Sequence, residues 1–155
     1  MSEFEIKVDM LLSSLEKKRE ALSAILNITE NQNLVLADRS NPAYAAMFNE
    51  MNNIKQENID EVIELDNLFQ GVFGGISEGF EEMAENCKPK VSQMQDLISE
   101  VLEMDIKIRA AEQKNRVIAD EIRQASGSQP TKSQPNGAAK NHLLKQYEKN
   151  KKQEG

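Results

Sequence analysis

The apolar residues of this chain recur at alternating steps of three and four from Phe4 to Ile122, interrupted by two loops and a glycine-rich stretch. Such steps place side chains on one stripe of an α-helix, and the stripe is buried only when another helix packs against it. In the first segment the stripe consists of Phe4, Val8, Leu11, Leu15, Leu22, Ile25 and Leu36. The pattern predicts an all-α protein built from long helices lying side by side.

The composition agrees with this fold class. Of the 155 residues, 5% are aromatic, none is Trp and 29% are charged, which is typical of long solvated helices. The length suits a single domain with a tail. We expect a soluble, cytoplasmic protein, because the chain has no signal-peptide pattern, no apolar run that spans a membrane, and only one cysteine.

Charge is distributed unevenly between two parts of the chain. Residues 1–126 contain 13 Lys and Arg against 24 Asp and Glu, a balance of −11, whereas residues 127–155 contain six Lys against two Glu, a balance of +4. An acidic body repels phosphate backbones, so we expect no nucleic-acid partner. The basic tail either folds back on the acidic body or reaches a separate partner.

Capping and turn residues predict an elongated antiparallel bundle of three helices within residues 1–126. The first helix should begin near Ser2 and end near Ala37, and Asn41 with Pro42 should start the second. A turn at 86–89 should lead into the third helix, which ends near Ser126. Short connections make neighbouring helices antiparallel, so we place the second helix between the other two.

Four glycines fall within the second predicted helix, whose apolar rhythm continues to Met83: Gly71, Gly74, Gly75 and Gly79. Each glycine costs a helix about 1 kcal/mol relative to alanine, so the helix should be kinked or broken there. Such a break is either a kink at a close helix contact or a hinge that admits a partner.

Residues 127–155 read as a flexible tail, because the stretch to Gly137 is rich in Ser, Gln, Pro, Asn and Gly. A short helix over 138–152 is possible there. It would present Leu143, Leu144 and Tyr147 among lysines, and it would either dock or remain disordered.

Polar residues interrupt the apolar stripes at matching distances along the predicted helices. They are Thr29 and Gln32 in the first helix and Gln113 and Asn115 in the third, with Asn52 or Gln56 of the second nearby. Buried amides can fix the register of packed helices. The alternative is that these residues face water at the end of the bundle.

The sequence offers little for catalysis. The one histidine, His142, lies in the predicted tail, and Cys87 has no second cysteine or nearby histidine to form a nucleophile or a zinc site. The glycines lack the Lys-Ser/Thr that completes a phosphate-binding loop. We expect no enzymatic activity, no metal and no cofactor.

Several apolar residues lie off the main stripes, namely Leu102, Ile106 and Val117 in the third helix and Ile6, Met10, Ile28 and Val35 in the first. A sheet-like arrangement of three helices cannot bury two stripes on each helix. We expect a second copy of the chain, the tail or a client protein to cover the surplus. The alternative is a tight bundle with ordinary scattered exposed aliphatic residues.

Three runs of sequence carry a resemblance to a known family. They are Leu15-Glu-Lys-Lys-Arg-Glu-Ala-Leu22, continuing to Ile28-Thr-Glu-Asn-Gln32; residues 54–66, from Ile54 to Asp66; and Glu112-Gln-Lys-Asn-Arg116. Residues 4–124 resemble the FlgN and FliT class of flagellar export chaperones, which are small, acidic, helical cytoplasmic proteins. The glycine cluster and the polar linker before Ala138 depart from that pattern.

The resemblance implies a type III export chaperone that holds C-terminal helical segments of hook-associated or filament-cap proteins before secretion. It further implies that the third helix supplies the client groove, with Leu102, Ile106, Gln113 and Val117 as contact residues. The tail would cover this groove or contact the export machinery. A structural coiled-coil adaptor or self-assembling helical subunit is the alternative, and a homodimer is compatible with either.

Overall fold

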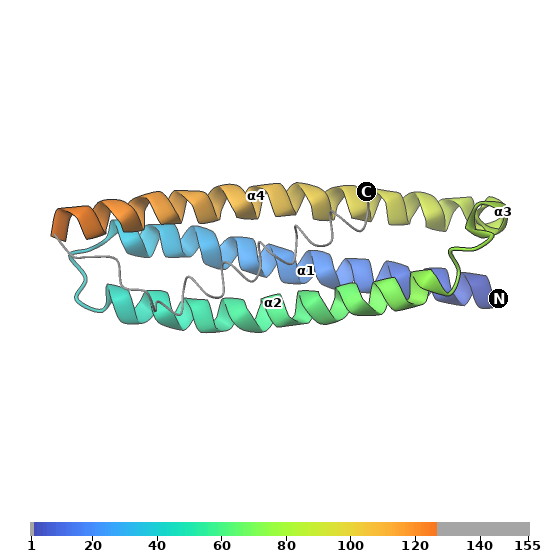
Figure 1. Cartoon of the computed structure of the whole chain (residues 1–155), viewed down its shortest axis with the longest axis horizontal. Coiled ribbons are helices and arrows are strands. Elements are labelled where there is room, and N and C mark those ends of the chain that lie inside the picture. The colour runs from blue at the N-terminus through green and yellow to red at the C-terminus, as the bar shows by residue number, and fades with distance from the viewer. Residues whose placement is uncertain (1, 127–155) are drawn as a thin grey trace.

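The computed structural model of this chain describes residues 2–126, which form an elongated bundle of three long helices (Figure 1). Helix α1 spans Glu3–Ala37, α2 spans Tyr44–Gly74, and α4 spans Lys88–Ser126. A short helix α3, Phe80–Ala84, and a 3-10 turn, Glu85–Cys87, connect α2 to α4. The predicted all-α fold is therefore confirmed, whereas the predicted tail, residues 127–155 with the short helix 138–152, lies outside the described residues.

The beginning of α1 forms as its sequence predicts. The Ser2 side chain accepts a hydrogen bond from the Glu5 backbone N–H at 3.1 Å, and the acidic residues Glu3 and Glu5 lie in the first turn, where they favour the helix dipole. The second helix begins slightly later than predicted, at Tyr44. Asn41 caps the turn that precedes it, because its Oδ1 accepts from the Ala43 backbone N–H at 3.0 Å.

The second helix ends earlier than its apolar rhythm indicates. Helix α2 stops at Gly74, and the chain turns through Gly79, whose φ of 76° is a left-handed conformation that glycine adopts readily. The predicted break at the glycine cluster is therefore confirmed, and Met83 lies on the short helix α3 and not on the second helix. The second turn lies at 75–79 and not at 86–89, because residues 85–87 already coil into the start of α4.

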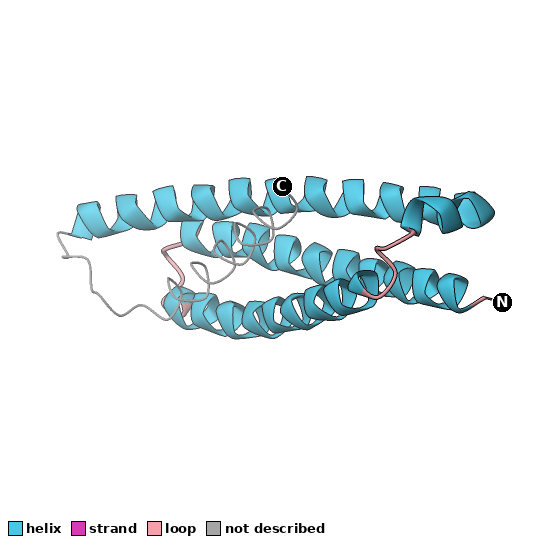
Figure 2. Ribbon diagram, turned by 45° about the vertical axis from the view of Figure 1, so that its right-hand side comes forward, coloured by secondary structure: helices cyan, strands magenta, loops and turns pink. Residues whose placement is uncertain are grey.

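Helix α1, and not α2, lies between the other two long helices (Figures 1 and 2). It packs along both α2 and α4, which have little backbone contact with each other. The reason is the wide apolar arc of α1, in which neighbouring residues such as Leu11 with Leu12 and Ala21 with Leu22 are all buried. One part of that arc faces α2 and the other faces α4, which corrects the order predicted from connection lengths.

The interior changes in character along the bundle. The end that holds α3 is rich in aromatic residues, with Phe80 packing 5.6 Å from both Phe4 and Phe73 between ring centroids. The middle is aliphatic and is built around Leu22, Ile59 and Ile108. Polar side chains fill the opposite end, where Thr29 and Gln32 are completely buried.

Candidate functional site

An apolar groove of about 500 Å³ opens between α2 and α4 in the half of the bundle nearest α3. Its floor is formed by α1, with Ser14, Leu15 and Lys18. Its walls come from α2, with Leu65, Asp66, Phe69, Gln70, Phe73 and Gly74, and from α4, with Ile98, Val101 and Leu102. A concave surface that is lined mostly by apolar and aromatic side chains is the usual form of a binding site.

One ion pair lies among the apolar residues of the groove. Lys18 of α1 and Asp66 of α2 are 2.6 Å apart, and their side chains are 14% and 9% exposed. Breaking a buried pair of this kind leaves an uncompensated charge, so the pair holds the α2 wall in place against α1. The two charges in the groove therefore neutralise each other, and the groove presents a mainly apolar surface to a ligand.

The four predicted contact residues lie along one face of α4. A step of four residues leads from Ile98 in the groove wall to Leu102 and a second such step leads to Ile106, so these side chains share one stripe. Leu102, Ile106 and Val117 are 45%, 67% and 46% exposed, and Gln113 is also exposed. Leu102 alone lines the groove, and the other three continue its line toward the opposite end of α4.

The opposite wall of this face is set by the register of α2 against α4. Lys55 of α2 pairs with Glu112 of α4 at 2.6 Å, and the two helices run in opposite directions. Equal steps from this pair therefore bring Leu65 level with Leu102 along the bundle axis. The groove contains both Leu65 and Leu102, which agrees with this register.

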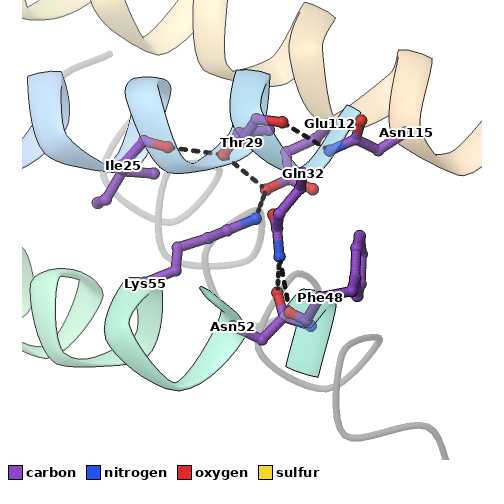
Figure 3. Close-up of polar contacts among 8 residues, drawn as sticks. All are labelled: Ile25, Thr29, Gln32, Phe48, Asn52, Lys55, Glu112 and Asn115. Atoms are coloured by element: carbon purple, nitrogen blue, oxygen red, sulfur yellow. Dashed lines mark hydrogen bonds and ion pairs between the residues drawn. The ribbon is translucent and has the colours of Figure 1, made fainter. Parts of the chain in front are cut away.

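A layer of buried polar side chains closes the bundle beyond the groove (Figure 3). Asn115 donates to the Thr29 carbonyl oxygen at 2.9 Å, and Gln32 donates to Asn52 Oδ1 at 2.6 Å. The expected role of Thr29, Gln32, Asn115 and Asn52 as a buried layer is confirmed. Gln113 is exposed, and Gln56 is half-buried and donates to Asp60, so neither belongs to the layer.

The charged members of this layer were not predicted. Lys55 and Glu112 are 4% and 5% exposed, and Thr29 Oγ1 also donates to Glu112 at 3.3 Å. Burial lowers the pKa of the Lys55 ammonium, and the neighbouring Glu112 carboxylate opposes that shift. The sequence contains one signal that could have identified this pair, which is the position of Lys55. It falls on the same stripe of α2 as Ile59 and Val62, and a cation buried on such a stripe needs a partner of opposite charge.

The groove contains none of the usual catalytic or metal-binding constellations. Among residues 2–126 no group of three or more His, Cys, Asp and Glu side chains is placed to hold a metal ion. Cys87 is buried in the aromatic end, where desolvation raises the pKa of its thiol. His142 lies outside the described part of the chain. No helix within that part is long and apolar enough to cross a membrane.

Comparison with known proteins gives no assignment. No family model, no curated protein and no solved structure matches this chain. The likeness to flagellar export chaperones therefore rests on the sequence runs described above.

Proposed function

We propose that this protein is a cytoplasmic type III export chaperone that binds a helical segment of a client, such as the C-terminal region of a hook-associated or filament-cap protein. The observation that carries the proposal is the groove between α2 and α4, continued by exposed Leu102, Ile106 and Val117. Because the three helices leave this apolar face uncovered, a fourth amphipathic helix could bind there and bury it.

The length of the face suits a client helix. From Ile98 to Val117 the stripe covers 20 residues of α4, and these two residues are about 28 Å apart along the helix axis. A partly folded client exposes an apolar helix face that would otherwise self-associate, and a groove of this length covers several of its turns. Most of the stripe is aliphatic, so recognition is by burial of apolar surface with Gln113 as a polar contact.

Co-expression with C-terminal segments of hook-associated and filament-cap proteins tests the proposal. The full chain should form a stable complex with at least one of them, and Ile106→Asp should abolish it. Leu34→Asp is the matched control, because Leu34 and Ile106 are both 67% exposed while Leu34 lies on α1, outside the lining of the groove. A well-folded chain that binds none of these segments would refute the proposal.

A structural adaptor or self-assembling subunit is the second candidate function. Apolar side chains are also exposed away from the groove, with Ile6 and Met10 of α1 at 49% and 43%. Such a patch suits contact between copies of the chain. Light scattering of the purified protein separates the two functions: a persistent high-order oligomer favours the adaptor, and a monomer or loose dimer favours the chaperone.

A further inference from the structure

Helix α4 carries a second stripe on the face turned away from the core, which we call the outer stripe. Its residues are all exposed, recur at steps of three and four, and include no charged side chain: Ser92, Gln95, Ser99, Leu102, Ile106, Ala110, Gln113 and Val117. From its first to its last residue it extends over about 37 Å. Steps of three and four on an exposed face are the pattern that packs against one further helix.

The charges beside the outer stripe are divided by sign about position 105. On one flank Asp96 and Glu103 precede this position, and Lys107 and Lys114 follow it; all four are exposed. Asp96 and Lys114 each lie nine positions from it, and Glu103 and Lys107 each lie two positions from it. At 100° per residue these side chains lie about 55–95° from the centre of the stripe, where the flanks of two packed helices meet. This flank is therefore complementary to its own reversed copy.

We infer that the outer stripe of α4 binds the outer stripe of a second copy of the chain, antiparallel, about a two-fold axis at position 105. In such a pair each flank faces the same flank of the other copy. Asp96 then lies level with Lys114 of the other copy, and Glu103 lies level with Lys107. Each pairing occurs twice, so the contact contains four pairs of opposite charge around Leu102 and Ile106.

The other flank is compatible with the same arrangement. Its cations Arg109 and Arg116 follow position 105, whereas Val91 and Ile98 precede it. In the antiparallel pair the two arginines therefore face apolar side chains of the other copy. A parallel pair would instead place them beside the basic half of the first flank, which begins at Lys107, and like charges would meet.

The chain's own C-terminal segment fits the outer stripe less well than a second copy does. Its apolar residues Leu143, Leu144 and Tyr147 span five positions, which would cover about 7 Å even as a helix. Residues 127–155 contain six Lys against two Glu, which does not match a flank with two carboxylates and two cations.

This inference does not depend on the proposed function. The dimer is the state of the chain without a client, because a client helix on Leu102 and Ile106 would exclude the second copy. Sedimentation of the natural full-length chain should show a monomer–dimer equilibrium. A chain that remains monomeric over the whole concentration range would overturn the inference, and a client complex found by co-expression would still support the groove.

Cross-linking tests the antiparallel register. Ser99 and Ala110 are exposed on the outer stripe, six positions before and five positions after position 105, so they lie nearly level across the pair. A mixture of Ser99→Cys and Ala110→Cys should cross-link with a short bis-maleimide. Each variant alone should not, because equal positions are about 15–18 Å apart along the axis. The natural chain is the control, since Cys87 is buried. Cross-linking within either variant alone at the rate of the mixture would refute the antiparallel pair.

Charge reversal tests the pairing itself. Asp96→Lys/Glu103→Lys places Lys opposite Lys, and Lys107→Glu/Lys114→Glu places Glu opposite Glu, so each variant alone should self-associate at least about tenfold more weakly. An equimolar mixture should form a heterodimer at least as tight as the natural dimer, because every pairing is then attractive. Thermal unfolding checks that both variants remain folded. A mixture no tighter than its components would overturn the inference.

The control variant separates this pairing from net charge. Asp96→Lys/Glu103→Lys raises the net charge of the chain from −7 to −3, which by itself reduces repulsion between two acidic molecules. Glu57→Lys/Glu61→Lys makes the same change on α2, away from the outer stripe, and should leave self-association unchanged or stronger. Equal weakening in both variants would show that the charges beside the outer stripe have no specific partner.

Discussion

The two halves of this bundle use the same three helices differently. At the end where α1 turns into α2, polar side chains from all three helices meet, and the Lys55–Glu112 pair joins α2 to α4. At the end near α3, an open apolar groove lies between the same two helices. Apolar stripes alone permit neighbouring helices to slide by a heptad, and a polar layer penalises that slip. One end therefore fixes the alignment, and the other can remain open.

Removing Glu112 should produce the largest loss of stability. Glu112→Ala leaves the buried Lys55 ammonium without its partner, so the free energy of unfolding should fall by about 3–5 kcal/mol in urea denaturation. Replacing both residues, as Lys55→Met/Glu112→Leu, should restore stability close to that of the natural chain. A double variant that is as unstable as Glu112→Ala would show that the layer stabilises by some other means.

Truncation of an apolar side chain should separate the two halves within a single helix. Ile108 of α4 is 1% exposed in the aliphatic middle, so Ile108→Ala should lower the free energy of unfolding by about 2–5 kcal/mol. Leu102, six residues earlier on α4 and in the groove wall, is 45% exposed, so Leu102→Ala should cost less than about 1 kcal/mol.

The same two variants should rank in the opposite order for binding. Leu102→Ala removes part of the groove wall and should weaken a bound helical peptide, whereas Ile108 lies in the core and does not line the groove. Thermal unfolding and peptide titration of both variants provide the check. Equal loss of stability in the two would mean that Leu102 belongs to the core and not to an open face.

The sequence predicted the periodic parts of this molecule and missed those that depend on contacts between helices. All seven residues of the first predicted stripe are buried, because the helical period alone fixes which face they share. The central position of α1 was missed, since it follows from the width of the apolar arc. Met83 was placed on the second helix because the spacing of apolar residues along that helix continues past the turn at Gly79.

The candidate site shows the same division. Leu102, Ile106 and Val117 were predicted to be surplus apolar residues, and all three are exposed. Gln113 was placed both in the polar layer and in the client groove, and it is exposed on α4 outside the layer. The α2 wall of the groove was not predicted. Phe73 is part of that wall, and its place there depends on where α2 ends.

Glycine substitutions should give the smallest effects and should differ in sign. An added Cβ at Gly71 or Gly74 meets no atom within 4 Å, so neither glycine is required by close packing. Gly71→Ala and Gly74→Ala should each raise the free energy of unfolding by about 1 kcal/mol, because alanine favours a helix. Gly79→Ala is the matched contrast: its φ of 76° should make that variant less stable by about 1 kcal/mol.

Peptide binding by the two stabilised variants then tests whether the open end is rigid. Gly74 lines the groove, and Gly71 lies one turn before it, so both glycines weaken the last turns of the α2 wall. Unchanged affinity in Gly71→Ala and Gly74→Ala would mean that the groove already has its binding shape. Lower affinity together with higher stability would mean that the end of α2 moves to admit the helix, since a stiffer wall resists that movement.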